Sequence, residues 1–500
     1  MADSSSPRHF FGHPLGLASL FGTEMFERFS YYGMRALLIL FMTATAAHGG
    51  LGVDAQAAGA IYGLYASGVY LAGLPGGWVA DRVLGQREAV FWGGVLIAAG
   101  NFLLAVPRGT TVFYIGLLVI ALGTGLLKPN ASSLVGELYK GQSGSRRDSA
   151  YSIYYLGINL GGFVAPFVAG TIGETVGFHW GFLAAGLAMV VGLVWFRASE
   201  GWLGDAGHLS TALTAAARRH SRTLLIICAI AIVAIVALAA VDVLRLDVVG
   251  LAHAARYILP AIAAVFFIYA LGFGGLTVIE KKRVGVIAVF VVSFSIFWAG
   301  YEQAGSTLNL FARDFTDRSL LGSWFASGQH PASWYQSIPP VFVLLLAPVF
   351  AWMWVSLDRH HRDPSAPAKL GAGMVILGLS FALMMVAARL VISSGHAVMP
   401  GWLWATYFLQ VAGELCLSPI GLSNVSKLAP ERFVGQMMGA LFLGMAIGNL
   451  NAGLIGGAAG SGGITSLPDL FLKVALLSAG AGVVLLFASR ALRVWMGGVR

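Results

Sequence analysis

Long apolar segments separated by short polar breaks follow one another along the whole chain. A helix needs roughly 20 mostly apolar residues to cross a bilayer, and fourteen segments approach or exceed that length. They lie near residues 15–43, 57–80, 88–107, 112–131, 149–172, 179–197, 222–243, 256–279, 284–312, 334–357, 370–394, 400–421, 434–458 and 469–492. The apolar runs are unbroken, whereas strands of a membrane barrel alternate apolar and polar positions over about ten residues. The pattern therefore predicts an all-α polytopic membrane protein.

The composition agrees with this fold class. Hydrophobic residues make up 57% of the chain and charged residues 11%, and the mean hydropathy is +0.78. Soluble domains carry about a quarter charged residues, so a soluble protein is excluded. The 66 glycines fit a bundle of membrane helices, where small residues let neighbouring backbones approach closely. Cys228 and Cys416 lie in separate apolar segments, so we expect neither a disulfide framework nor a metal site.

Lysines and arginines are distributed unevenly between the two ends of the predicted spans. The breaks on the side of the N-terminus hold about three times as many as the breaks on the other side. The positive-inside rule then places both termini in the cytoplasm, for a multi-pass protein of the inner (plasma) membrane. The formal net charge of +9 lies mainly in short loops and serves orientation, so it does not indicate nucleic-acid binding.

A repeated loop motif indicates two related halves. Val79-Ala80-Asp81-Arg82 ends the second span, and Ser356-Leu357-Asp358-Arg359 ends the tenth. The fuller form in the first half resembles the loop motif of the major facilitator superfamily, through Gly77, Asp81, Arg82, Gly85 and Arg87. The resemblance implies two six-helix bundles. We expect them at residues 1–197 and 284–500, with a cytoplasmic linker and an inserted two-helix hairpin at 198–283.

The first span concentrates ionisable side chains, which are expensive inside a membrane and therefore suggest function. Glu24, Arg28, Tyr31 and Arg35 recur at the spacing of one helix face, and Glu27 and Tyr32 flank them. On a surface helix such residues would merely form neutralising ion pairs. Within a bilayer the same pattern favours a functional site.

Three further spans each carry one ionisable residue. Lys128 ends the fourth span, Glu302 follows Trp298 in the ninth, and Glu414 lies in the twelfth. Lys128 also fits an interfacial lysine that extends toward water. Glu302 and Glu414 have no basic residue within four positions, so each is either protonated or paired with another helix. Both alternatives suit a proton-coupled carrier.

The string Glu24-x-x-Glu27-Arg28-Phe29-x-Tyr31-Tyr32-Gly33 resembles the first-helix signature of the proton-dependent oligopeptide transporter family, a branch of the major facilitator superfamily. The similarity extends along nearly the whole chain. It includes Tyr70, the Gly77 to Arg87 loop, Lys128-Pro129-Asn130, Tyr154-Tyr155 with Asn159, Trp298 with Glu302-Gln303, Gln336-Ser337, and Gly413-Glu414-Leu415. Bacterial members similarly carry an extra hairpin.

The resemblance implies import of di- and tripeptides together with protons, and no other cofactor. A general peptide site must hold the two charged ends of the peptide and tolerate the side chains between them. Arg28, Arg35 and Lys128 are implied to bind the carboxylate, and Asn159 and Glu302 the ammonium, with help from Glu414. The implied pocket walls are Tyr31, Tyr32, Tyr70, Trp298 and Phe297. The implied proton-coupling residues are Glu24, Glu27, Arg28, Glu302 and Glu414, with a pair between Arg35 and Glu302 that breaks when peptide binds.

The chain departs from the family pattern at three places. Tyr301 stands where members often have a second acid before the glutamine, Pro339-Pro340 replaces an asparagine-proline pair, and Ala440-Leu441 replaces a tryptophan. These differences suggest a shifted or narrowed range of peptides.

Other function classes fit less well. A drug/proton antiporter of the same superfamily needs neither the first-span string nor so many cations. A small organic or inorganic anion carrier could use the three cations, but four acids would repel the anion. No metalloprotease or nucleophile-elbow motif lies in a span, so no catalytic residue, metal site or enzyme activity is expected. We expect a monomer in the lipid bilayer.

Overall fold

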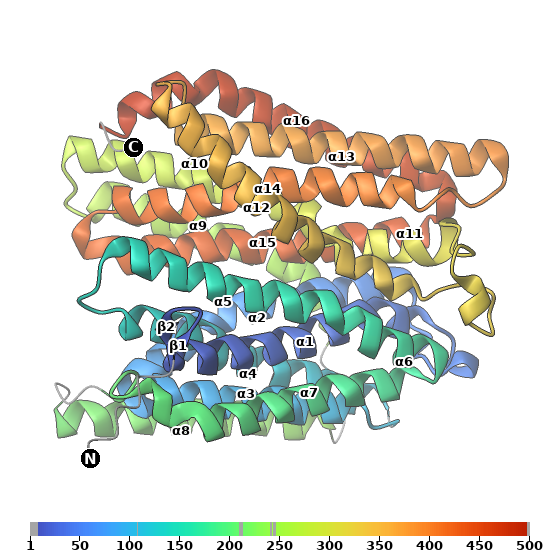
Figure 1. Ribbon diagram of the computed structural model, residues 1–500, viewed down its shortest axis with the longest axis horizontal. Coiled ribbons are helices and arrows are strands. Elements are labelled where there is room, and N and C mark those ends of the chain that lie inside the picture. The colour runs from blue at the N-terminus through green and yellow to red at the C-terminus, as the bar shows by residue number, and fades with distance from the viewer. Residues whose placement is uncertain (1–8, 108, 210–213, 241–242, 244–246, 498–500) are drawn as a thin grey trace, which may run out of the picture. The chain divides into compact units, whose positions relative to one another are not determined.

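The computed structural model describes residues 9–107, 109–209, 214–240, 243 and 247–497. Fourteen helices of 19 residues or more account for most of these residues, which confirms the predicted fold class (Figure 1). Four basic residues that enter the orientation argument, Arg8, Arg108, Arg245 and Arg500, lie outside the described residues.

The helices follow the predicted spans closely. Their bounds are α1 Leu15–Thr43, α2 Ala55–Val79, α3 Gln86–Leu104, α4 Thr110–Leu138, α5 Gly144–Ala165, α6 Thr171–Thr175, α7 Phe178–Ser199, α8 Ala215–Ala240, α9 Val248–Phe273, α10 Val278–Tyr301, α11 Thr307–Phe315, α12 Ile338–Arg359, α13 Ala366–Ser394, α14 Gly401–Leu428, α15 Val434–Ser461 and α16 Gly463–Trp495. Two short strands, β1 His9–Phe10 and β2 His13–Pro14, pair before α1.

Single helical turns of other geometry extend or join these helices. The π-helical ones are η2 Ala80–Leu84 and η3 Pro166–Gly170. The 3-10 ones are η1 Ala46–His48, η4 Glu200–Leu203, η5 Glu302–Gly305, η6 Gly322–Trp324, η7 Ala332–Ser337 and η8 Glu431–Phe433.

Twelve helical segments in the described part of the chain are long and apolar enough to cross a membrane. Helices α1 and α14 are of similar length, 29 and 28 residues, but are not among the twelve. Helix α1 contains Glu24, Glu27, Arg28 and Arg35, and α14 contains Glu414. Helices α1 and α14 are thus too polar to meet the composition expected of a membrane span, and both carry ionisable residues that suggested function.

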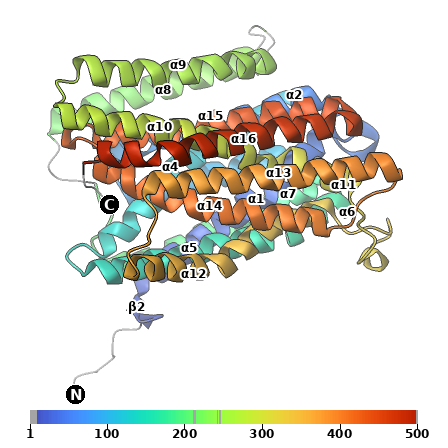
Figure 2. The same cartoon turned by 90° about the horizontal axis from the view of Figure 1, so that it is seen from above.

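The chain divides into two compact units. Unit 1 holds the chain up to Leu37 and Leu71–Asp247, and unit 2 holds Leu38–Tyr70 and Val248–Arg500. Within unit 1, α3 packs along α4. Within unit 2, α13 packs along α16, as the two views of the ribbon show (Figures 1 and 2). The predicted domain boundaries at 197 and 283 stay predictions.

The ninth predicted span is not one continuous helix. Helix α10 ends at Tyr301, a 3-10 turn follows at η5, and α11 begins at Thr307. Ser306 has φ −123° and ψ −92°, outside the helical range. The Gln336 side chain donates a hydrogen bond to the carbonyl of Ala304, which the break removes from the helical ladder. The predicted span over 284–312 is thus confirmed within the segment Val278–Phe315, but its helix is interrupted at Glu302–Ser306.

Glycines bring α2 and α15 into backbone contact within unit 2. A Cβ atom added at Gly59 would lie 2.4 Å from the Gly453 carbonyl oxygen, and one at Gly63 would lie 2.6 Å from the Leu450 carbonyl oxygen. The partner Gly453 has the same property, since its Cβ would lie 2.4 Å from the Gly59 oxygen. Gly59/Gly63 and Gly453/Gly457 are both pairs four residues apart, the spacing that lets membrane helices pack closely.

We predict that Gly63→Ala lowers the free energy of unfolding by about 1–3 kcal/mol, because the new methyl group forces the two backbones apart. Gly68→Ala is the matched control in the same helix, since a Cβ there meets no atom within 4 Å. Alanine favours helix over glycine by roughly 1 kcal/mol, so the control should be neutral or stabilising. Thermal unfolding of the purified protein in detergent measures both, and equal midpoints would contradict the close-packing argument.

Candidate functional site

Helix α1 carries a buried cluster of three charged side chains in unit 1. Arg28 Nη2 donates to Glu27 Oε1 at 2.6 Å, and Arg28 Nε donates to Glu27 Oε2. The same Nε lies 3.4 Å from Glu24 Oε1. All three residues are at most 3% exposed. One guanidinium thus faces two carboxylates, and Arg28 alone cannot balance both negative charges.

Tyr154 and Lys128 complete the surroundings of Glu24. Tyr154 Oη donates to Glu24 Oε2 at 2.7 Å, and the Lys128 ammonium acts on Glu24 electrostatically. Helix α5 can approach α1 because a Cβ at Gly161 would lie 2.1 Å from the Met25 carbonyl oxygen. Sequence reasoning did not assign Tyr154 to the site. Tyr154 lies three and seven residues before Gly157 and Gly161, which places all three on one helix face. This spacing could have indicated that Tyr154 faces a closely packed helix.

Helices α1 and α5 carry four further candidate residues, Tyr31, Tyr32, Arg35 and Asn159. The Arg28 guanidinium lies 4.9 Å from the centre of the Tyr31 ring, and the Arg35 guanidinium lies 5.8 Å from that of Tyr32. Asn159 is buried and donates through Nδ2 to the Tyr155 carbonyl oxygen, so its amide oxygen is the atom that can accept a further hydrogen bond. The predicted polar face of α1 is therefore buried protein interior.

A second group of candidate residues lies in unit 2. Glu302 is 5% exposed and begins η5, where the α-helix gives way to a 3-10 turn. Its carboxylate acts electrostatically on Glu414 of α14, and Tyr301 donates a hydrogen bond to the Glu414 carboxylate. Gly413 is in backbone contact with Gly373 of α13, since a Cβ at Gly413 would lie 2.8 Å from the Gly373 carbonyl oxygen. Glu302 and Glu414 therefore form a pair of interacting acids, and Tyr301 is hydrogen-bonded to one of them.

Aromatic rings surround this acid pair. The Trp298 ring centre lies 5.3 Å from that of Tyr301 and 6.4 Å from that of Tyr70. Phe297 stacks on Tyr301 at 5.7 Å. Five of the predicted wall and site residues belong to unit 2, namely Tyr70, Phe297, Trp298, Glu302 and Glu414, and the remaining candidate binding residues belong to unit 1.

The loop motif contacts the segment that follows α7. Arg87 donates to the carbonyl oxygens of Ala206 and Gly204, and its backbone NH donates to Gly207 O at 3.2 Å. Gly85 has φ +84°, a conformation that favours glycine, and a Cβ there would lie 2.8 Å from the Leu209 nitrogen. Gly77, Asp81 and Arg82 belong to the same motif. Asp81 and Arg82 are exposed, and a Cβ at Gly77 would meet open space.

The positions that depart from the family pattern have structural roles of their own. Pro339 and Pro340 lie in the first turn of α12, where a missing backbone NH is tolerated. Ala440 and Leu441 are buried in α15. In the described part of the chain no three His, Cys, Asp or Glu side chains are grouped so that they could hold a metal ion.

Known proteins resemble this chain over nearly its whole length. A sequence model of the POT family matches residues 87–459. The peptide transporter YePEPT of Yersinia enterocolitica subsp. palearctica is 42% identical over 96% of this chain and 95% of its own length. A di-/tripeptide transporter of Lactococcus lactis subsp. cremoris is 35% identical over 88% of each chain. The crystal structure of a peptide transporter POT in complex with sulfate covers 98% of both chains with a TM-score of 0.89 and 39% identity.

We predict that Tyr154→Phe lowers the free energy of unfolding by about 1–2 kcal/mol, because it leaves a carboxylate oxygen of Glu24 without its hydroxyl donor in a buried place. Tyr114→Phe is the control, since the half-buried Tyr114 ring of α4 keeps its contact with Phe113, with ring centres 5.7 Å apart, when the hydroxyl is removed. Chemical unfolding in detergent micelles measures the difference. The same loss in both variants would show that the Tyr154–Glu24 hydrogen bond contributes nothing specific.

Proposed function

The chain belongs to the POT family, and we propose on this basis that it is a symporter that imports di- and tripeptides with protons by alternating access. The observation that carries the proposal is the set of buried ionisable groups, which a membrane protein without a polar substrate would not need. The relatives named as peptide and di-/tripeptide transporters support the substrate class.

Unit 1 offers the groups that suit the carboxylate end of a peptide. Arg28 and Arg35 present guanidinium groups, and Lys128 presents an ammonium group. Arginine can bind a carboxylate through two parallel hydrogen bonds, which fixes its orientation as well as its charge. The Asn159 amide oxygen is an acceptor suited to a peptide ammonium group. Arg28 is engaged by Glu27 and Glu24, so a peptide carboxylate would compete with these two acids for its guanidinium group.

Unit 2 offers the groups that suit the ammonium end and the proton. Glu302 and Glu414 interact with each other, and burying two neighbouring carboxylates as anions is costly. Either a proton or a substrate ammonium group relieves that cost. The proton and the peptide ammonium group therefore act on the same two acids. This competition couples the movement of the proton to the movement of the peptide.

Tyr301 stands at the position where family members often have a second acid, and it contacts the Glu302–Glu414 pair. Its hydroxyl donates to Glu414, so it supplies a neutral hydrogen bond where an acid would add negative charge. Each unit also offers aromatic surface, Tyr31 and Tyr32 in unit 1 and Tyr70 and Trp298 in unit 2, and such surface tolerates varied side chains. The chain should accordingly bind peptides by their ends, within a range that the departures from the family pattern shift or narrow.

The alternatives have less support. A drug/proton antiporter does not require the Glu24, Glu27 and Arg28 cluster, and an anion carrier would be opposed by the four acids. We propose a monomeric, multi-pass protein of the inner membrane with both termini in the cytoplasm, no catalytic activity, and the proton as its coupling ion.

The proposal predicts that purified protein in liposomes accumulates labelled dialanine when the pH gradient is directed inward. An uncoupler should leave only downhill exchange, because the proton gradient supplies the driving force. Uptake of the labelled peptide over time, with and without the gradient, measures this. Accumulation driven by an outward proton gradient would instead identify an antiporter, and accumulation without any ion gradient would refute symport.

We predict that Glu302→Gln abolishes proton-driven accumulation but retains peptide exchange across the membrane. Glutamine keeps the shape and hydrogen-bonding capacity of the acid while holding it neutral, so no proton can be released. The exposed Glu431 of η8 offers the control Glu431→Gln, which should accumulate peptide normally. Counterflow and gradient-driven uptake separate the two activities. Wild-type pH dependence in Glu302→Gln would move the coupling role to Glu414, Glu24 or Glu27.

A further inference from the structure

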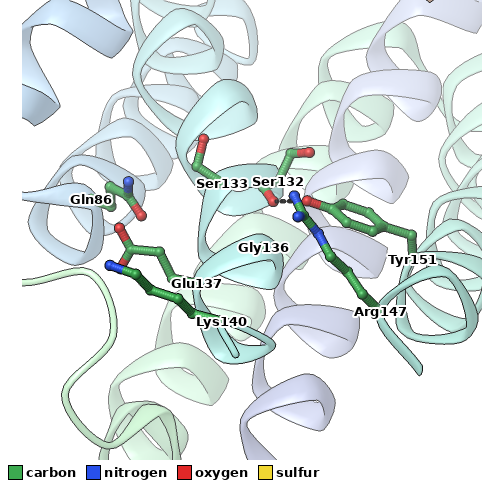
Figure 3. A pocket seen from close by; sticks show the side chains of 8 residues that line it. All are labelled: Gln86, Ser132, Ser133, Gly136, Glu137, Lys140, Arg147 and Tyr151. Atoms are coloured by element: carbon green, nitrogen blue, oxygen red, sulfur yellow. Dashed lines mark hydrogen bonds between the residues drawn. The ribbon is translucent and has the colours of Figure 1, made fainter. Parts of the chain in front are cut away.

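A polar pocket lies at the end of α4 and the beginning of α5 in unit 1, away from the buried cluster of α1. Its volume is about 410 Å³, which falls in the range of small-ligand sites. Residues of α3, the α4–α5 turn and both helices line it: Gln86, Ser132, Ser133, Gly136, Glu137, Lys140, Arg147 and Tyr151 (Figure 3). Since α4 is a membrane-spanning helix, this end of the pocket faces the membrane surface rather than the bilayer core.

Two cations occupy opposite sides of the pocket. Figure 3 shows Arg147 and Tyr151 on one side of Gly136, and Lys140, Glu137 and Gln86 on the other. Among the described residues neither Lys140 nor Arg147 makes an ion pair. The Arg147 guanidinium lies 5.8 Å from the centre of the Tyr151 ring, which orients it without neutralising it.

The one acid of the pocket is committed elsewhere. Glu137 Oε2 accepts a hydrogen bond from the Gly207 backbone NH at 2.7 Å, so it holds the segment that also contacts Arg87. Two cations and one such acid leave a net positive pocket. The Ser132 hydroxyl and the Gln86 amide add neutral hydrogen-bonding groups.

Gly136 makes room between the two cations. A Cβ added there would lie 3.0 Å from Tyr151 Oη and 3.3 Å from Arg147 Nη2. Any side chain would therefore crowd the guanidinium and the hydroxyl. The glycine leaves open the space that a ligand would need in order to reach Arg147.

We propose that this pocket binds a phosphate group, with Arg147 and Lys140 as its charged donors. Several oxygens on one centre allow a phosphate to meet groups on both sides of the pocket, and arginine matches two of them at once. The phosphate comes either from the headgroup of an anionic phospholipid or from a soluble phosphate compound. A basic pocket between membrane helices near the surface suits a headgroup, so the lipid is the source to be tested first.

The test compares binding by full-length wild type and four variants. Arg147→Gln and Lys140→Gln each remove one charged donor, and Gly136→Ala fills the space while keeping both charges. Arg146→Gln is the matched control, because it removes the same charge one residue away. Arg146 Nη2 lies 3.3 Å from the Gly12 carbonyl oxygen and does not line the pocket. The probes are phosphatidylglycerol in phosphatidylcholine nanodiscs, and inorganic phosphate added to protein in detergent.

Native mass spectrometry of retained lipid and the phosphate-induced shift of the thermal midpoint are the measurements, with unliganded midpoints as the check that each variant folds. We expect the three pocket variants to bind roughly tenfold more weakly than wild type or Arg146→Gln. Loss of phosphatidylglycerol retention alone identifies a lipid headgroup site, and loss of the phosphate shift alone identifies a site for soluble phosphate. Equal loss in Arg146→Gln, unchanged binding in Gly136→Ala, or no binding by wild type would overturn the proposal.

Discussion

The cost of placing charge inside a membrane governs this structure. Arg28 is almost fully buried, and it is tolerated because Glu27 accepts hydrogen bonds from its guanidinium group and Glu24 forms an ion pair with it. Two carboxylates around one guanidinium then require further donors, which α5 supplies through Tyr154. That hydroxyl reaches Glu24 because Gly157 and Gly161 let α5 lie directly on α1. The charged cluster therefore depends on the glycine pattern. The glycines allow α5 to pack on α1, and α5 carries the tyrosine that donates a hydrogen bond to Glu24.

The same logic explains the irregular backbone of unit 2. Helix α10 gives way to a 3-10 turn at Glu302, and such turns within a span are common at hinges. The Ala304 carbonyl freed by the break is satisfied by Gln336. A short, specifically supported break beside a buried acid pair can shift between two arrangements more readily than a continuous helix, because fewer ladder hydrogen bonds must change.

The positions of the helices could be predicted from the sequence, but the side-chain contacts between helices could not. Bilayer thickness fixes the length of an apolar run, so the predicted first span of 15–43 coincides with α1. Helical periodicity also placed Glu24 and Arg28 on one face. The bonds of Tyr154 to Glu24 and Tyr301 to Glu414 depend on the rotation and distance of other helices, which periodicity does not contain. The break after Tyr301 was missed for the same reason, since its support comes from Gln336, thirty-two positions from Ala304.

The end of α4 shows how one short stretch can serve two requirements. Glu137 holds Gly207 by its backbone, and Arg87 of the loop motif holds Gly204 and Ala206, so both clamp the same segment. The backbone NH satisfies one oxygen of the Glu137 carboxylate and leaves its negative charge in place. Lys140 lies in the α4–α5 connection and Arg147 in the first turn of α5, so these two cations face a single acid in the pocket. The loop motif and the phosphate pocket are thus joined through a single carboxylate, and the pocket stays positive because its two cations outnumber that acid.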